Sequence, residues 1–198
     1  MYTVVPIGGE DVLQPAGEAF DSLVSAARAG APWAFERLYR QLAPAVAGYL
    51  RMQGASEPDD LTSDVFLRVF TGMGRFTGTG EQFRSWVFTI AHHRLVDDRR
   101  RLARRPQPAA EDPSDLAIPL AADAEGEAMR RLSVQRVRAL CDLLAPDQRD
   151  VLLLRMVGDL TLEETAEALG KSVGAVKSLQ HRSVASLRRL AEREGVSL

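Results

Sequence analysis

The 198-residue sequence contains a single cysteine, which excludes a disulfide within the chain and fits a reducing compartment. It also lacks any apolar run approaching the ~18–20 residues that a membrane-spanning helix needs, so we expect no membrane insertion. Residues 1–11 show no basic flank followed by an apolar block, which argues against a signal peptide. Together these absences predict a cytoplasmic protein.

The motifs of common metal and nucleotide sites are missing as well. There is no Cys-x-x-Cys pair, no His-Glu-x-x-His helix and no phosphate-binding glycine loop with a lysine. His92 and His93 are adjacent, so they cannot both face one site on a helix. The isolated Cys141 is most simply a small buried apolar residue. We therefore predict no catalytic residues, no metal site and no cofactor.

The net charge is only −2, but the charges are segregated along the chain. Residues 84–105 carry seven arginines against two aspartates, a net charge of +5. Residues 106–127 carry six acids and no lysine or arginine, and residues 171–193 carry six basic residues against one acid. Basic blocks of this kind can form phosphate-binding surfaces, although each can equally be the solvated face of a helix.

The hydrophobic pattern predicts an all-α protein, because no stretch sustains the period-two alternation of a strand. Apolar residues recur at helical spacing in Phe35, Leu38, Tyr39 and Leu42, and Pro32 suits the first turn of that helix. The prolines, alanines and acids of residues 106–127 predict a flexible acidic linker. We expect a flexible tail at residues 1–17 and two helical domains at residues 18–105 and 128–195.

Two more helices are expected in the first domain. Ser56 is expected to cap one of them, and glycines between residues 72 and 80 mark the loop that follows it. The other is a long helix over residues 82–104. At about 100° per residue, its apolar side is expected to lie roughly opposite three polar residues. These are Ser85, His92 and Arg99.

A helix-turn-helix pattern occupies residues 162–181. Thr161 and Glu164 have the spacing of a capping box, Gly170 can adopt the left-handed conformation that ends the first helix, and Ser172 is expected to cap the second. The second helix of such a motif enters the major groove of DNA, whereas an ordinary helical hairpin is the alternative interpretation. The small residue, turn glycine and apolar anchor that the motif needs are Ala166, Gly170 and Val176.

Read together, these segments resemble a known family. Residues 60–68, 75–76 and 83–91 resemble region two of the bacterial sigma factors, and residues 143–155 with 172–178 resemble region four. The length, with no domain between the two, points to the extracytoplasmic-function group of the sigma-70 family. The resemblance implies a helical, non-catalytic protein that binds core RNA polymerase and promoter DNA.

The resemblance implies that the helix over residues 60–68 docks on the clamp helices of the largest polymerase subunit. We expect contacts with the beta and beta-prime subunits. Asp60 and Asp64 lie one turn apart and can pair with basic residues there, or they are simply solvated carboxylates. Val65 and Phe66 suit either the interface or the core. A stand-alone helix-turn-helix regulator, the alternative function, would not need this helix.

Region two of the family binds the minus-ten element and captures a flipped base, which needs aromatic or planar surfaces. Phe83 and Trp86 also lie on the apolar stripe and so suit core packing. His92 and His93 replace the Arg-Asn pair common in the family, which predicts an altered sequence preference. The implied minus-ten residues are Arg75, Phe76, Phe83, Arg84, Trp86, His92, His93, Arg94 and Arg99.

Region four of the family reads the minus-thirty-five element. Leu179 and Gln180 depart from the pattern Ser-Arg-Leu-His-Arg that is frequent in the family, so one arginine contact is expected to be missing. A glutamine at position 180 can read adenine instead if it points into the groove. The implied minus-thirty-five residues are Ser172, Val173, Ala175, Lys177, Ser178, Gln180, His181 and Arg182.

The family also suggests a role for the linker and a further partner. In the family the linker threads toward the RNA exit channel, where an anionic peptide imitates nucleic acid. A self-repelling tether is the alternative for this composition. Family members are usually held inactive by an anti-sigma protein, so we expect such a partner here.

Overall fold

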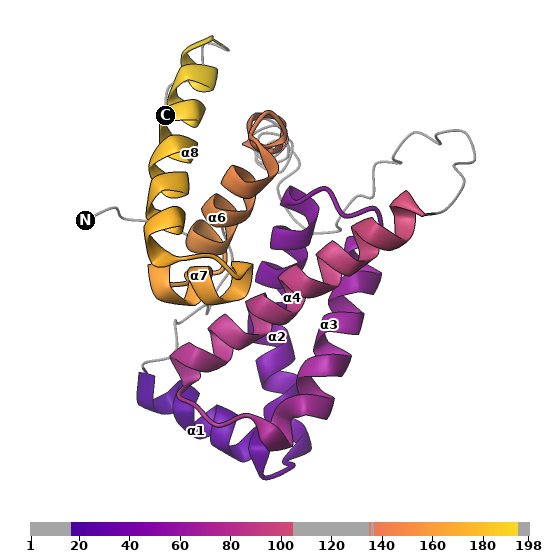
Figure 1. Cartoon of the computed structure of the whole chain (residues 1–198). Coiled ribbons are helices and arrows are strands. Elements are labelled where there is room, and N and C mark those ends of the chain that lie inside the picture. The colour runs from indigo at the N-terminus through magenta and orange to yellow at the C-terminus, as the bar shows by residue number, and fades with distance from the viewer. Residues whose placement is uncertain (1–16, 105–134, 136, 194–198) are drawn as a thin grey trace, which may run out of the picture.

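The computed structural model describes residues 17–104, 135 and 137–193, and all regular structure within these ranges is helical (Figure 1). The predicted all-α fold is confirmed. The predicted acidic linker, and the predicted tail except Gly17, lie outside the described residues. No helix in the described part of the chain is long and apolar enough to cross a membrane.

The helices form two groups. The N-terminal group contains α1 (Gly17–Arg28), α2 (Pro32–Met52), α3 (Pro58–Gly72), the 3-10 helix η1 (Met73–Arg75) and α4 (Gly80–Ala103). The C-terminal group contains α6 (Pro146–Met156), α7 (Leu162–Leu169) and α8 (Val173–Arg193), preceded by helical residues 137–142.

Local sequence signals account for most helix starts. Pro32 occupies the first turn of α2, as predicted. A capping box not foreseen from the sequence starts α4, where the amide of Gln82 donates to the Thr79 hydroxyl at 3.3 Å. The predicted cap by Ser56 is wrong, because α3 begins at Pro58 and its start has no side-chain cap. The fixed φ of that proline presets the first turn, and two acids there favour the positive end of the helix.

The N-terminal group is built on a core rich in aromatic side chains. Tyr49, Phe66, Phe83 and Phe88 are among the largest fully buried side chains. The rings of Tyr49 and Phe88 meet edge to face with their centroids 5.7 Å apart. This arrangement joins α2 to α4, and α3 packs against both of these helices.

In the C-terminal group, α7 and α8 form the predicted helix-turn-helix. The Thr161–Glu164 capping box is present, and Gly170 ends α7 with φ 60° in the left-handed region. Ser172 caps α8 by accepting from the amide of Ala175 at 3.2 Å. A small cluster of buried residues closes the motif; it consists of Val151, Ala166, Val176 and Leu179.

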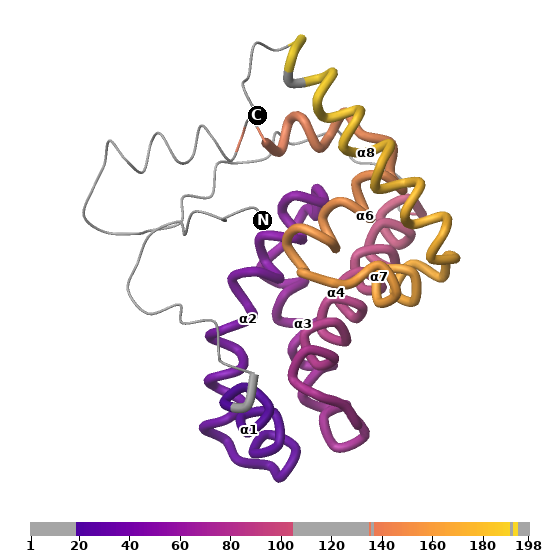
Figure 2. The backbone as a smooth tube through the Cα atoms, turned by 90° about the vertical axis from the view of Figure 1, so that its left-hand side faces the viewer, coloured from indigo at the N-terminus to yellow at the C-terminus, as the bar shows by residue number. Residues whose placement is uncertain are grey.

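The two groups pack directly against each other, with α7 beside α4 in both views (Figures 1 and 2). The main hydrophobic core runs without a break from the N-terminal group into α6 and the turn that follows it. Leucine side chains supply this continuation; they are Leu152, Leu153, Leu154 and Leu160. Cys141 lies in the same core, which confirms the prediction that it is a buried apolar residue.

Candidate polymerase and promoter interfaces

The outer face of α3 carries the predicted polymerase-binding carboxylates. Asp60 and Asp64 are both exposed and lie one helical turn apart. Leu67 continues the same face and is 64% exposed, although α3 is otherwise buried along its apolar side. The prediction from sequence missed Leu67. Its signal was present, since Leu67 falls outside the stripe of Leu61, Val65 and Val69. We call Asp60, Asp64 and Leu67 the acidic-apolar face.

Val65 and Phe66 do not belong to that face. Val65 is 0% exposed and Phe66 is 2% exposed, so both are core residues. The Phe66 ring packs edge to face on Tyr39 with a centroid distance of 4.9 Å. This corrects their assignment to the docking surface: their side chains hold α3 against α2 and are not available to a partner in this structure.

One predicted polymerase contact is already engaged within the chain. Asp64 accepts from the guanidinium of Arg94 at 2.6 Å, which links α3 to α4. Arg94 is itself one of the residues implied in minus-ten binding. An ion pair with one side chain half exposed contributes little to stability, typically below ~1 kcal/mol. A partner charge can therefore replace it at small cost.

The aromatic residues implied in minus-ten binding form one cluster beneath the loop between η1 and α4. Phe76 stacks on Trp86 with centroids 5.1 Å apart and planes 27° apart, and both rings are half-buried. Phe83 is fully buried beneath them, 5.3 Å from Phe76, and this corrects its assignment as a base-contacting residue. Gly72 lies so close that a Cβ there would be 3.1 Å from the Trp86 ring.

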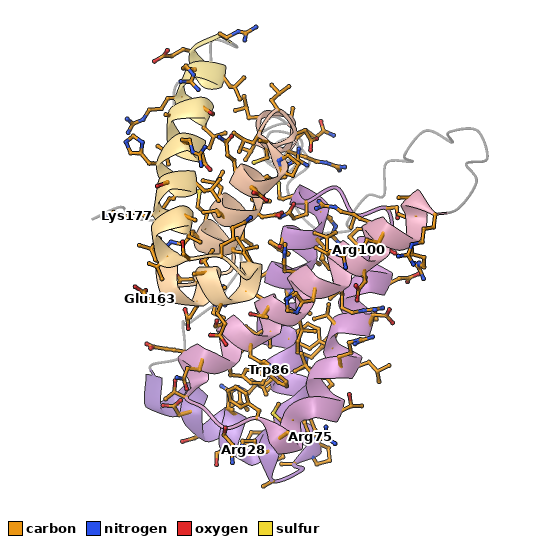
Figure 3. The ribbon with its side chains drawn as sticks, in the orientation of Figure 1. Arg28, Arg75, Trp86, Arg100, Glu163 and Lys177 are labelled. Carbon is orange, nitrogen blue, oxygen red and sulfur yellow. The ribbon has the colours of Figure 1, made fainter. Side chains whose placement is uncertain are left out.

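The basic residues on this surface differ in accessibility. Arg75 and His93 are exposed, and Arg75 lies with Trp86 toward the lower end of the N-terminal group, whereas Arg100 lies farther along α4 (Figure 3). Arg99 is half-buried and donates to the backbone and side-chain oxygens of Gln53.

His92 is buried, which corrects its predicted place on a polar side of the helix. It is 6% exposed, and its Nδ1 lies 3.0 Å from the hydroxyl of Tyr49. Burial lowers the pKa of His92, and the nearby carboxylate of Asp150 partly opposes that effect. The prediction failed because Tyr49 of α2 and Asp150 of α6 lie near this side of α4, and a helical wheel contains no information about neighbours from other helices.

Arg84 is directed into the contact between the two groups. Its Nε donates to the Gly158 carbonyl at 2.8 Å, and its terminal nitrogen donates to the Val157 carbonyl at 3.0 Å. The guanidinium also lies 5.3 Å from the centroid of the Phe88 ring. Burial lowers the pKa of Arg84, and Asp159 partly opposes this. In this conformation the Arg84 guanidinium is engaged with protein carbonyls.

Helix α8, the second helix of the helix-turn-helix, presents an exposed face. Two of the predicted residues, Ala175 and Gln180, are only half exposed, so Gln180 is less available to bases than its neighbours. Lys177 lies on the outer part of α8 (Figure 3). The turn before α8 is fixed by an ion pair of 2.9 Å between Lys171 and Asp147. The exposed predicted residues are Ser172, Val173, Lys177, Ser178, His181 and Arg182.

Comparison with known proteins agrees with this geometry. The family model described as Sigma-70 region 2 matches residues 38–105, and the one described as Sigma-70 region 4 matches residues 142–189. The chain is 35% identical over 170 residues to the ECF RNA polymerase sigma factor BldN of Streptomyces coelicolor, with 85% of this chain covered. It spans 64% of the length of BldN.

A second relative is covered more fully. The chain is 34% identical to the ECF RNA polymerase sigma factor SigD of Mycobacterium tuberculosis, over 87% of this chain and 84% of SigD. Among solved structures, CnrH in complex with the cytosolic domain of CnrY matches with a TM-score of 0.64 and 25% identity. That match covers 88% of this chain and 98% of CnrH. The chain therefore belongs to the extracytoplasmic-function (ECF) family of RNA polymerase sigma factors.

Proposed function

We propose that the chain binds core RNA polymerase in the cytoplasm and directs it to a particular set of promoters, with no catalytic activity of its own. The observation that carries this proposal is the presence of both the acidic-apolar face of α3 and the helix-turn-helix of α7 and α8 on one chain. Regulators that act alone need only the second of these features.

The acidic-apolar face suits a basic helical partner. Two carboxylates one turn apart steer and orient a cationic surface, while Leu67 adds apolar area between polar neighbours. We assign this face to the clamp helices of the largest polymerase subunit. The buried side of α3 makes the face rigid, because Val65 and Phe66 anchor the helix.

For the minus-ten element we propose Arg75 and His93 as exposed contacts, with Phe76 and Trp86 as the half-buried surface for an unstacked base. A base stacked on an aromatic ring contributes ~1–3 kcal/mol to single-strand binding. For the minus-thirty-five element we propose the outer residues of α8. Of these, Lys177 and Arg182 supply positive charge for phosphates or guanine, and His181 lies between the two.

An anti-sigma protein is proposed as a further partner. CnrH, a structural relative at 25% identity, was solved in complex with the cytosolic domain of CnrY. A protein that covers the polymerase-binding surface of this chain would hold it inactive until a signal releases it.

The test is reconstitution with purified core polymerase and a promoter library. We expect the chain to yield transcription from a subset of promoters only when polymerase is present. A chain that shifts promoter DNA strongly alone and leaves polymerase inactive would identify a stand-alone regulator.

The acidic-apolar face has its own test. Asp64→Arg and Asp60→Arg should each weaken association with polymerase at least tenfold, with helical content unchanged. Asp60→Arg leaves the Asp64–Arg94 ion pair in place and so separates the two effects. The matched control is Glu167→Arg, the same charge change at an exposed carboxylate of α7. If all three variants bind polymerase with equal affinity, the acidic-apolar face is not the polymerase-binding surface.

A further inference from the structure

We propose that the α1–α2 corner is a second contact for melted promoter DNA and binds the single strand that leaves the rings of Phe76 and Trp86. The corner consists of Arg28, at the end of α1, and Trp33, in the first turn of α2. No motif in the sequence points to either residue. The inference rests on the proposed function, because this strand becomes available only when polymerase opens a promoter.

The backbone fixes the shape of the corner. Gly30 has a left-handed φ of 85°, and its amide and the amide that follows it donate to carbonyls in the last turn of α1, at 2.9 and 3.1 Å. This pair of bonds is the Schellman motif, which ends a helix at a glycine. Pro32 then starts α2 directly. The backbone positions of Arg28 and Trp33 are therefore ordered before any ligand binds, which lowers the entropy cost of binding.

Both side chains of the corner are exposed and available to a ligand. Trp33 is 58% exposed, more than any other aromatic side chain that the structure describes. Among the described residues, neither the Trp33 ring nor the exposed Arg28 guanidinium has a hydrogen-bond, ion-pair or ring partner. In contrast, Arg40, two turns farther along α2, is paired with Glu36 at 2.6 Å. The corner thus offers one uncovered ring and one uncompensated cation on the same tight turn.

The aromatic cluster of the minus-ten surface extends to α1. The Phe20 ring of α1 lies 6.3 Å from the Phe83 ring, and Phe83 lies 5.3 Å from Phe76. A Cβ on Gly80 would be 2.5 Å from Phe20, so the start of α4 lies directly on α1. The amide of the same glycine donates to the Asp21 carboxylate. Helix α1 is therefore fixed to the cluster, and the position of the corner relative to the cluster is fixed with it.

Arg75 connects the cluster to the corner. It directly precedes Phe76 in the chain, and the 3-10 helix η1, which it ends, packs against α1. Figure 3 shows Arg28 and Arg75 at the same end of the N-terminal group, below Trp86. Both arginines are exposed, and neither has an acidic partner in the part of the chain that the structure describes. A strand that leaves the two rings meets Arg75 first and reaches Arg28 next.

The arrangement also gives the direction of the strand. In Figure 3, Trp86 lies between Lys177 of α8 and the end that carries Arg28. The outer residues of α8 are assigned to the minus-thirty-five element, which lies upstream of the minus-ten element. The corner, on the far side of Trp86, therefore meets the strand downstream of the minus-ten element.

The chemistry of the corner fits a single-stranded nucleic acid better than a protein. The centre of a protein interface needs several apolar anchors, but between residues 19 and 37 the only large apolar side chain that is exposed is Trp33. Arg28 precedes this ring, and the exposed Arg37 follows it by one helical turn. A single ring flanked by arginines provides a stacking face for a base and cations for its phosphates. Because stacking accepts any base, the corner adds affinity without sequence preference.

The test compares two promoter probes that are bound by holoenzyme, made from core polymerase and the full chain. Both probes have a double-stranded upstream part and a single-stranded nontemplate minus-ten element. The short probe ends directly after that element, and the long probe continues downstream as a single strand. The variants are Trp33→Leu and Arg28→Gln, with Trp33→Phe to keep the ring. The matched control is Arg40→Gln, the same charge change at an exposed arginine of α2 that is paired within the chain.

We expect Trp33→Leu to weaken binding of the long probe about tenfold, as for the loss of one stacked base, and to leave binding of the short probe unchanged. Arg28→Gln should lower the slope of log affinity against log salt by ~0.7 for the long probe alone, as for one phosphate contact on a single strand. Trp33→Phe and Arg40→Gln should bind both probes as wild type does. Circular dichroism and thermal unfolding check that every variant is folded.

Three other results would overturn the inference. If Trp33→Leu and Arg28→Gln bind the long probe as wild type does, the corner does not bind the strand, and the proposed function stands. If both variants weaken the association with core polymerase in the absence of DNA, the corner is a protein contact. If the wild-type chain forms no holoenzyme, the proposed function fails, and the assignment of the corner to melted DNA fails with it.

Discussion

The two helical groups are stabilised in different ways. The N-terminal group encloses an aromatic core, with Phe83 and Phe88 fully buried among four packed helices. Among the residues that the structure describes, the C-terminal group encloses a four-residue cluster of its own, and the leucines of α6 extend the core of the other group instead. The N-terminal group thus supplies most of the shared core, and the C-terminal group depends on it for part of its burial.

The largest expected change in the free energy of unfolding comes from truncating one side chain in each core, and comparing the two changes tests this contrast. Phe83→Ala should cost ~3–5 kcal/mol of unfolding free energy, because it leaves a large cavity among packed rings. Leu179→Ala, in the small cluster beneath α8, should cost about 2 kcal/mol, at the lower end for such truncations, because fewer side chains surround it. Urea denaturation followed by circular dichroism measures both. Equal costs would contradict the claim that the two cores differ.

The next effect concerns the contact between the groups. Gly158→Ala places a Cβ 2.6 Å from the Leu154 carbonyl oxygen, and we expect a destabilisation of ~1–3 kcal/mol from overpacking. Gly174→Ala is the matched control, since nothing lies within 4 Å of its added Cβ and helix propensity should gain ~0.5–1 kcal/mol. Opposite signs in thermal unfolding are the expected result. A Gly158→Ala chain as stable as wild type would show that the turn can shift freely.

Local signals in the sequence predicted the local structure of the helix-turn-helix correctly. The capping box at Thr161 and the left-handed turn at Gly170 depend on residues within one or two turns of the chain, and the structure contains both. The same holds for the exposed stripe of α8, whose outer residues follow from helical spacing once the helix is placed.

Residues whose environment is set by distant segments could not be placed in this way. His92 looked polar and solvated, but it is buried, with Tyr49 of α2 in contact and Asp150 of α6 nearby. Arg84 looked free for DNA, but it binds carbonyls of the turn after α6. In both cases the missing information was how the two groups pack, and no spacing rule within either group contains it.

A smaller effect should appear as a pH dependence from His92. Its pKa is below the ordinary 6.5 in the folded chain because of burial, while Asp150 acts in the opposite direction and His93 and Arg99 reinforce the lowering. Below pH 6.5 the unfolded chain therefore binds a proton that the folded chain does not. Stability should fall as the pH decreases through that window and level off below the folded pKa.

The measurement is the melting temperature of wild type and His92→Gln between pH 7.5 and 5, with His93→Gln as the exposed control. We expect His92→Gln to flatten the pH dependence and His93→Gln to retain it. If the melting temperature of His92→Gln depends on pH as steeply as that of wild type, a group other than His92 causes the pH dependence.

The smallest effect on stability, close to zero, is expected for Lys177→Ala on the exposed face of α8. Its consequence should appear in DNA binding, where the loss of one phosphate contact lowers the slope of log affinity against log salt by ~0.9. Holoenzyme binding to a matched promoter at several salt concentrations measures this slope. An unchanged slope would show that Lys177 contacts a base or does not contact DNA, and that it does not bind a phosphate.

The four consecutive buried residues of α6, from Val151 to Leu154, have one more consequence. Successive helical side chains point 100° apart, so four in a row are directed over most of the circumference of the helix. Whenever the two groups separate, the leucine side chains that were buried between them become exposed to water. If the groups stay apart with no other protein on that surface, the exposed leucines favour self-association. A cell avoids such aggregation when it keeps the unbound, open chain at low concentration.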